Sequence, residues 1–325
     1  GVVAREVSVL DELDRSWSEI QRWLRELLRD ETDEVLAEEL LVFPGLEELM
    51  ALRAVREVEA TGEFDVCVVD CAPTGATLRM LRFPDALRIF MENFFDLERR
   101  GARLLRPLME RVHAKGVVPR EEFFEAIERL YSDVEDVRQI LLDGDRTTAR
   151  LVVNPARVVV EETRRSFAYL SLYGVATDAV VDNRLLPAEA AGGYLARWAE
   201  RERGELDSIE ASFPIPQFRA PLYPRELRGI EDLAGLARDV YGDRDPADLF
   251  THARPIRLRK HAGRTRLEVD LPSVSKEEIE VTTRGSDLLV QVRNASRWIA
   301  LPASVRGRPI RKVRLRDGVL EVDFG

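Results

Sequence analysis

One stretch of the sequence combines a carboxylate, hydroxyl groups and a glycine in an order suited to a phosphorylated ligand. The β-branched run Val66 to Val69 is typical of a strand buried on both faces of a parallel sheet, and Asp70 follows at its carboxyl end. Thr74, Gly75 and Thr77 come next, at the predicted turn into a helix. Ligands of open α/β sheets bind at this edge, where a carboxylate can serve Mg²⁺ and backbone amides can contact phosphate. Spacing alone leaves open the alternative that Asp70 only caps the following turn.

Residues 70–79 carry a more specific signal. Asp-Cys-Ala-Pro-Thr-Gly-Ala-Thr-Leu-Arg resembles the switch II motif Asp-Thr-Ala-Pro-Thr-Gly-His-Thr-Leu-Arg of the ATPase family that includes arsenite-pump ATPases and the tail-anchored-protein targeting ATPase. The departures are Cys71 and Ala76. The resemblance implies ATP and Mg²⁺ as cofactors, and Asp70 as the residue that holds a water on the metal. It also implies switch residues at four positions: Pro73, Thr74, Gly75 and Thr77.

Length and composition fit a large globular protein with a charged surface. The chain has 325 residues, of which 45% are hydrophobic and 33% charged. The sequence contains no apolar run of the roughly 18 to 20 residues that a membrane helix needs, and no signal peptide opens it. We therefore expect a cytoplasmic protein without an integral membrane segment. Cys67 and Cys71 lack zinc-site spacing and are expected to be small core residues, with a redox role as the alternative.

Charge is distributed unevenly along the chain. Residues 252–325 contain 16 Lys and Arg against nine Asp and Glu, a net charge of +7, and the total of −10 leaves −17 for residues 1–251. This difference predicts two domains, which we place at 1–250 and 254–325. The basic residues alternate with apolar ones instead of forming a cluster, so a nucleic-acid partner is not expected.

The 325 residues contain no Gly-x-x-x-x-Gly-Lys-Ser/Thr phosphate loop. In the family that the chain resembles, this loop and switch I precede switch II. We therefore hypothesise that the chain is truncated at its amino terminus and does not hydrolyse ATP alone; an upstream reading frame without a Gly-Lys-Thr sequence would contradict this. The alternative is a protein that has lost ATPase chemistry.

Helical periodicity dominates the regions on both sides of the Asp70 stretch. Helices are predicted at 11–30, 33–42 and 45–60, and almost throughout 85–142. The helical subdomain at about 85–145 could line a groove for an apolar client helix, as the family resemblance also implies. Ordinary core packing remains the alternative. The groove candidates form an aromatic and methionine stripe: Phe90, Met91, Phe94 and Phe95.

The next part of the chain alternates strands and helices. Strands are predicted at 149–154 and 179–183, a helix up to Tyr173 ended by Gly174, helices at 188–211 and 230–241, and a proline-punctuated strand and loop between these two helices. Here the chain resembles the second half of the same ATPase family. By that resemblance Asn183 reads the edge of adenine, and Pro221 and Leu222 pack on the base. The alternative for Asn183 is a turn-forming residue after a strand.

From about Pro255 the apolar period changes to two. Strands are predicted at 265–271, 279–283, 287–292, 297–301, 310–315 and 319–324, with turns at Gly285 and Asp317-Gly318. The segments at 271–280, 287–290 and 315–322 resemble the α-crystallin domain of small heat-shock proteins. The predicted fold class is therefore α/β: a mainly parallel sheet of the P-loop NTPase type with an inserted helical subdomain, followed by a small all-β sandwich.

Two classes of function are consistent with these features. The first is an ATPase acting as a nucleotide-driven homodimer that couples hydrolysis to binding or targeting of a hydrophobic client protein. The second is a non-enzymatic, chaperone-like binding module. An arsenite-efflux ATPase subunit is a weaker variant of the first, because the sequence has only two cysteines for a soft metalloid.

Overall fold

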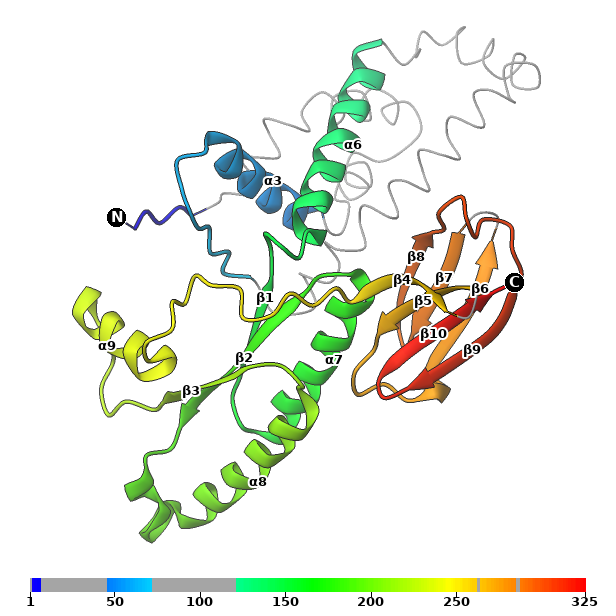
Figure 1. Cartoon of the computed structure of the whole chain (residues 1–325). Coiled ribbons are helices and arrows are strands. Elements are labelled where there is room, and N and C mark those ends of the chain that lie inside the picture. The colour runs from blue at the N-terminus through cyan, green and yellow to red at the C-terminus, as the bar shows by residue number, and fades with distance from the viewer. Residues whose placement is uncertain (1, 7–45, 72–120, 262–263, 285–286) are drawn as a thin grey trace, which may run out of the picture. The chain divides into compact units, whose positions relative to one another are not determined.

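The computed structural model describes residues 2–6, 46–71, 121–261, 264–284 and 287–325 (Figure 1). The chain divides into two compact units, Gly1–Ile140 and Leu141–Gly325. The predicted helices at 11–30 and 33–42 lie outside the described residues, as does the first part of the predicted helical subdomain.

Two helices are described in the first unit, α3 (Leu46–Thr61) and α6 (Glu121–Leu142), the latter extending two residues into the second unit. They confirm the helices predicted at 45–60 and in the last part of 85–142. Gly62 follows α3 with a φ of 63°, a conformation in which glycine ends a helix without steric cost. Arg56 of α3 forms ion pairs with two carboxylates of α6, Asp133 and Asp136, the latter at 2.7 Å.

The second unit begins with a three-stranded parallel sheet in the order β1 (Ala149–Val153), β2 (Thr177–Leu185) and β3 (Gln217–Pro221). Each crossover contains a helix, as parallel pairing requires. These helices are α7 (Arg157–Tyr173) between β1 and β2, and α8 (Ala196–Ser212) between β2 and β3. A further helix, α9 (Gly229–Tyr241), follows β3 and packs against it.

Alternation along β2 divides its apolar side chains between two cores. Val180 packs with Val160 and Phe167 of α7 and with Ile209 of α8. Its neighbours Ala179 and Val181 belong to a second cluster that includes Phe218 and the half-buried side chains of α9. Both faces of the sheet are therefore covered by helices, which explains the continuous apolar run in β2.

The predicted helix at 188–211 is shorter than expected. Two 3-10 turns, η1 (Ala188–Ala191) and η2 (Gly193–Leu195), precede α8, which begins only at Ala196. Gly192 lies between the turns in an extended conformation and Gly193 has a φ of 67°. These two glycines interrupt the helical hydrogen bonding, and the chain between β2 and α8 forms a separate loop.

The remainder of the chain forms two antiparallel sheets, in the orders β4-β5-β10-β9 and β6-β7-β8. Their inner faces supply a core that includes Leu267, Val269, Leu288, Leu320 and Phe324. The predicted strands are confirmed, as is the Asp317-Gly318 turn, whose two residues have φ angles of 49° and 72°. An additional strand, β4, was not individually predicted. The bounds are β4 (Ile256–His261), β5 (Arg264–Asp270), β6 (Ile279–Arg284), β7 (Asp287–Val292), β8 (Ala295–Ala300), β9 (Ile310–Arg316) and β10 (Val319–Phe324).

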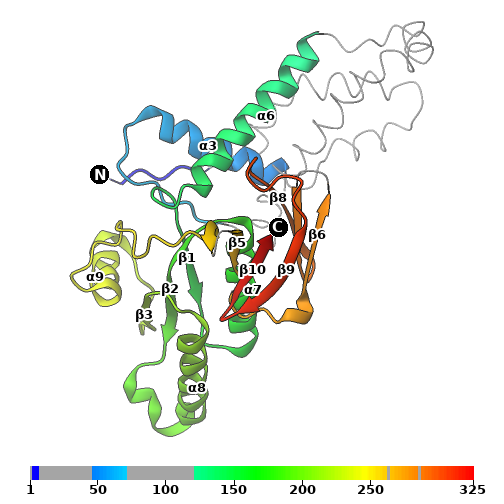
Figure 2. The ribbon, with the colours of Figure 1, turned by 45° about the vertical axis from the view of Figure 1, so that its right-hand side comes forward.

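The end of α7 contacts this sandwich directly (Figure 2). Arg297 of β8 is buried and donates a hydrogen bond to the carbonyl oxygen of Leu172 at 3.0 Å. A cation is favourable at a helix carboxyl end, where carbonyl groups lack helical partners. Gly174 ends the helix with a φ of 82°, and a Cβ there would lie 2.9 Å from Nη1 of Arg297. Glycine is therefore required for both the backbone conformation and the close approach of the arginine.

Candidate functional site

The carboxyl end of β2 contains an irregularity at the predicted base-binding residue. Asp182 pairs with Arg219 and Leu185 pairs with Pro221, so β2 advances three residues while β3 advances two. Asn183 and Arg184 therefore form a β-bulge, in which Arg184 has a φ of 59°. Such a conformation is uncommon for a residue with a side chain, and bulges beside functional sites change the direction of a side chain. Asn183 is half-buried at this position.

The other two predicted base contacts, Pro221 and Leu222, lie next to this bulge. Pro221 is the last residue of β3 and pairs with Leu185. The amide of Leu222 donates a hydrogen bond to the carbonyl oxygen of Leu185 at 2.8 Å, which fixes the chain as it leaves the strand. The side chain of Leu222 is exposed. The structure thus brings Asn183, Pro221 and Leu222 to the same edge of the parallel sheet, where ligands of α/β proteins bind.

Glu202 of α8 supports the loop that follows the bulge. Both of its carboxylate oxygens accept a hydrogen bond from the backbone amide of Leu186, each at 3.1 Å. A carboxylate that accepts from a backbone amide forms a charge-assisted hydrogen bond, which is stronger than one between neutral groups. The sequence analysis did not identify Glu202, because a glutamate in a charged helix carries no local signal of such a contact.

Asp182 is a second residue that the sequence analysis missed. Its side chain is 1% exposed, and neither carboxylate oxygen has a hydrogen-bond partner among the described residues. Burial raises the pKa of this carboxyl to about 6, with nearby Glu210 adding to the rise and Arg219 opposing it. A buried carboxylate without a hydrogen-bond partner is unfavourable in the charged form. Ionisation of Asp182, which lies next to Asn183, therefore lowers the free energy of unfolding.

We expect Asp182→Asn to increase the free energy of unfolding at pH 8 by about 2–3 kcal/mol. The folded-state pKa of about 6 exceeds the unfolded value near 3.8, so the folded chain binds the proton more tightly. The destabilisation by the charged carboxylate is fully present above about pH 7, where both states are ionised, and decreases as the pH falls through 6. It disappears only below about pH 3.8, where both states are protonated. Urea unfolding of the two proteins at pH 4.5, 6 and 8 tests this; a difference independent of pH would contradict it.

Asp70 belongs to the first unit, and its surroundings differ from the prediction. Residues 63–71 form no helix or strand and are exposed, with Val68 at 88%. The prediction of a buried strand at Val66–Asp70 is therefore wrong for this structure. An apolar run becomes a buried strand only when neighbouring strands bond to its backbone, and the described residues of the first unit contain no strand.

The two cysteines share this exposure. Cys67 and Cys71 both lie at the surface, so their assignment as core residues is also wrong. Pro73, Thr74, Gly75 and Thr77 of the predicted switch lie outside the described residues. So do the predicted client-groove residues Phe90, Met91, Phe94 and Phe95.

Two further properties of the described part of the chain concern metals and membranes. Its His, Cys, Asp and Glu side chains form no group of three or more that could hold a metal ion. A role for Asp70 in holding Mg²⁺ is thus a prediction from the motif.

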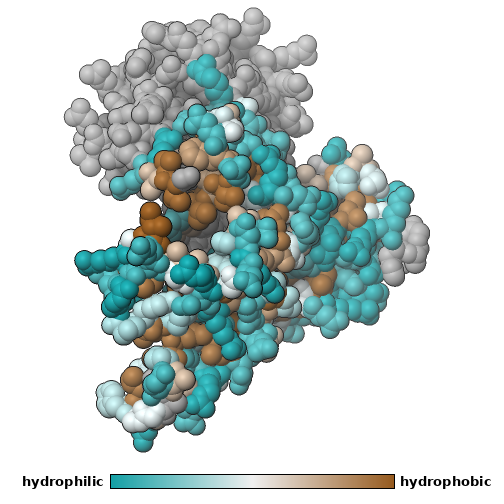
Figure 3. Space-filling view, turned by 60° about the vertical axis from the view of Figure 1, so that its left-hand side comes forward, coloured by the Kyte–Doolittle hydropathy of each residue, from teal (hydrophilic) through white to brown (hydrophobic). Residues whose placement is uncertain are grey.

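None of the described helices is long and apolar enough to cross a bilayer. Apolar side chains are nevertheless exposed in places, as the brown patches in Figure 3 show.

At the opposite end of the sheet, a buried ion pair fixes the segment that follows α9. Asp178 of β2 has no exposed side-chain surface and pairs with Arg150 of β1 at 2.8 Å. The guanidinium also donates to the carbonyl oxygens of Pro246 and Asp248, at 2.9 Å and 3.3 Å, and lies over the ring of Phe250. Burial alone would lower the pKa of Arg150, but the hydrogen bonds with Asp178 and Tyr241 raise it on balance. This cluster at the amino end of the sheet is structural.

Comparison with known proteins identifies the family. The model of the anion-transporting ATPase family matches residues 2–242, and that of an HSP20-like domain found in ArsA matches residues 262–324. A protein of Prosthecochloris vibrioformis, provisionally named an arsenical pump-driving ATPase, is 32% identical over 99% of this chain and 80% of its own length.

A protein of Aquifex aeolicus with the same kind of provisional name is 32% identical over 97% of this chain and 81% of its own length. The uncharacterised protein SCO2128 of Streptomyces coelicolor is 31% identical over 88% of this chain and 72% of its own length. The chain therefore belongs to the anion-transporting, or ArsA, ATPase family and carries the HSP20-like domain found in that family.

Proposed function

We propose that this protein binds ATP with Mg²⁺ and that hydrolysis drives a homodimer between states with different affinity for a hydrophobic client. The observation that carries the nucleotide site is the bulge at Asn183, with Pro221 and Leu222 on the adjacent strand end. An amide offers one acceptor and two donors, which suits the edge of adenine, and the apolar pair suits its faces. Membership of an ATPase family supports nucleotide as the ligand.

Asp70 and the residues after it have the proposed role of the metal-side switch. Asp70 holds a water on Mg²⁺, and Pro73, Thr74, Gly75 and Thr77 form the loop that responds to the terminal phosphate. The support is the match of residues 70–79 to the family motif. The phosphate loop is absent from residues 1–325, so we propose that turnover depends on residues outside this sequence and that these 325 residues alone do not hydrolyse ATP.

Asn183→Ala is expected to weaken binding of a fluorescent ATP analogue about tenfold, because roughly two neutral hydrogen bonds to the base are lost. Asn183→Asp retains an acceptor but no donor, so it should weaken ATP binding while narrowing the preference for ATP over GTP. Gln291→Ala, in β7 of the sandwich, removes a half-buried amide elsewhere and serves as the matched control. Titrations are made with the protein that includes any upstream phosphate loop.

The ATP titrations distinguish the ATPase from the non-enzymatic binding module. Unchanged ATP affinity in Asn183→Ala would remove this residue from the base site. An absence of nucleotide binding in the unsubstituted protein would favour the non-enzymatic, chaperone-like module instead, in which client binding is independent of ATP.

The proposed client site consists of Phe90, Met91, Phe94 and Phe95. We also propose that the chain divides into functional domains at 1–250 and 254–325, and that the protein is cytoplasmic. The support for the client site is the aromatic and methionine stripe in the sequence. The second candidate function, arsenite efflux, gains support from the names of two relatives and from the exposure of Cys67 and Cys71. Arsenite stimulation of turnover that is lost in Cys67→Ser would favour it.

A further inference from the structure

Strand β9 and the loop before it carry a dense, exposed cluster of cations. The eleven residues from Arg306 to Arg316 contain six Lys or Arg and no Asp or Glu, in a protein whose net charge is −10. Most of these side chains are exposed and only Arg314 is half-buried. The cluster consists of Arg306, Arg308, Arg311, Lys312, Arg314 and Arg316.

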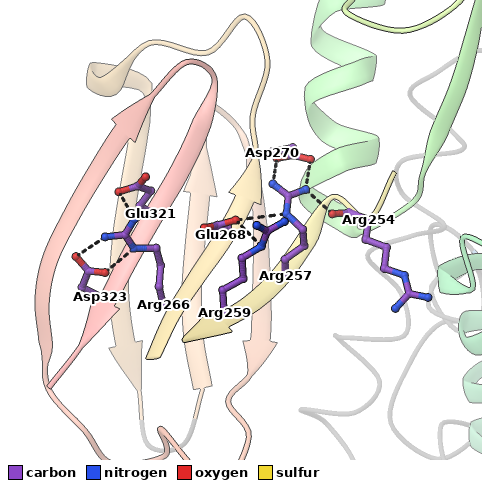
Figure 4. Close-up of polar contacts among 8 residues, drawn as sticks. All are labelled: Arg254, Arg257, Arg259, Arg266, Glu268, Asp270, Glu321 and Asp323. Atoms are coloured by element: carbon purple, nitrogen blue, oxygen red, sulfur yellow. Dashed lines mark hydrogen bonds and ion pairs between the residues drawn. The ribbon is translucent and has the colours of Figure 1, made fainter. Parts of the chain in front are cut away.

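Ion pairs connect several charged residues of the other three strands of the same sheet (Figure 4). Arg257 of β4 donates two hydrogen bonds to the carboxylate of Asp270, both at 2.6 Å. Arg266 of β5 pairs with Asp323 at 2.7 Å and with Glu321 at 3.0 Å, both on β10. The acidic side chains of the two central strands, β5 and β10, therefore already form ion pairs with arginines of β4 and β5.

Few carboxylates remain for β9. Arg314 reaches Glu321 only at 3.8 Å, and Glu321 is already paired with Arg266. Among the described residues, Arg311, Lys312 and Arg316 lie within ion-pair distance of no carboxylate. The two edges of the sheet thus differ: Arg257 and Arg259 of β4 have acidic partners, whereas Arg311, Lys312 and Arg316 of β9 are exposed.

The backbone of β9 is also open on one side. The strand order ends at β9, which pairs with β10 and with no second strand of the described chain. Figure 1 shows it at the margin of the sandwich. Charged side chains commonly protect exposed edges, and β9 carries four of the six cations and no acidic residue. They repel another copy of β9 and attract a strand of opposite charge.

We propose that β9 is a docking edge for an extended acidic segment of a partner protein, which adds to the sheet as a further strand. Lys312, Arg314 and Arg316 point to one face at every second residue, a repeat of roughly 6.8 Å along a strand. Acidic side chains at alternate positions of a paired strand have the same repeat. The ion pairs and the backbone hydrogen bonds between the two strands can therefore form in the same register.

Other anionic partners fit less well. Single-stranded nucleic acid is bound through aromatic side chains on which bases stack. The exposed large apolar residues of the described sandwich are Leu258 and Val313, neither of them aromatic. A membrane surface would require a larger apolar face beside the cations. An acidic strand needs only the open edge and the charges.

The test uses the whole chain and a fluorescent octapeptide of alternating Glu and Val, followed by anisotropy at 50 mM and 300 mM salt. We expect saturable binding at low salt that weakens at least tenfold in Lys312→Glu/Arg316→Glu. Lys260→Glu reverses one charge on the other edge strand, β4, and should alter the affinity less than threefold, whereas the matched single change Lys312→Glu should weaken binding more than threefold. A Lys and Val peptide should not bind. Circular dichroism checks that each variant is folded.

A second peptide separates strand addition from simple attraction of charges. N-methylation of alternate amides removes the hydrogen bonds on one edge of the peptide and leaves its charge unchanged. Binding should fall at least tenfold when the methylated edge is the one that faces β9. Equal binding of both methylated registers and the parent peptide would overturn the proposal, as would no binding of the parent. Tighter, competing binding of a single-stranded oligonucleotide would also overturn it and assign the edge to nucleic acid.

Discussion

Replacing Asp70 by asparagine is expected to lower ATP turnover by about 10- to 100-fold, the range for residues that orient a metal-bound water. Asparagine has a similar shape, but it lacks the charge that holds the water on Mg²⁺ and compensates the metal. Affinity for ATP should change little, because the proposed base contacts are Asn183, Pro221 and Leu222. The expected signature is a lower kcat, a nearly constant Kd for the nucleotide and a higher Mg²⁺ requirement.

Asp65→Asn is the matched control, since Asp65 is an exposed carboxylate in the same segment. The assay uses the protein with any upstream reading frame that supplies a phosphate loop. If Asp70→Asn and Asp65→Asn have the same turnover, Asp70 is no part of the metal site. If the unsubstituted protein binds ATP but never hydrolyses it, the nucleotide site stands and the enzymatic proposal fails.

Asp178→Ala is expected to lower the free energy of unfolding by about 3–5 kcal/mol, because it leaves the guanidinium of Arg150 without its buried counter-ion. The carboxylate of Asp178 is fully buried and also accepts a hydrogen bond from the amide of Phe250 at 3.4 Å. The loss therefore loosens the segment around Phe250 as well as the β1–β2 pair. Urea denaturation, monitored by circular dichroism, measures the change.

Two controls distinguish this ion pair from surface pairs. Asp145→Ala removes an exposed pair with Arg254, 2.9 Å apart, and should cost no more than about 1 kcal/mol. Arg150→Met/Asp178→Leu removes both charges and should recover most of the stability lost in Asp178→Ala, because no unpaired buried charge remains. A double variant as unstable as the single one would show that the arginine's contacts with the chain around Pro246 matter more than its charge.

Much of the fold could be predicted because its signals are local. The apolar run of β2, the helical period of α7 with Gly174 after it, and the Asp317-Gly318 turn each depend on residues close together in sequence. The predicted bounds of these elements agree with the structure to within a few residues. The resemblance at residues 70–79 pointed to the family that the comparisons then showed.

The Val66–Asp70 segment marks the limit of such reasoning. Its composition is that of a buried strand, yet the residues are exposed and form no strand. Composition records a preference for a half-buried, pleated environment, and only neighbouring strands provide that environment. Cys67 is exposed for the same reason.

By itself the sequence determined the alternation of strands and helices between residues 149 and 241 and the change to antiparallel β near Pro255. The family resemblance added Asn183 as a candidate for base recognition. Only the tertiary structure decided which charges meet. It buries Asp182 without a partner, joins Arg150 to Asp178 across two strands, and occupies the acids of β10 with Arg266 while the cations of β9 remain exposed. Strand register and crossovers place these residues together, and neither is encoded in any single segment of the chain.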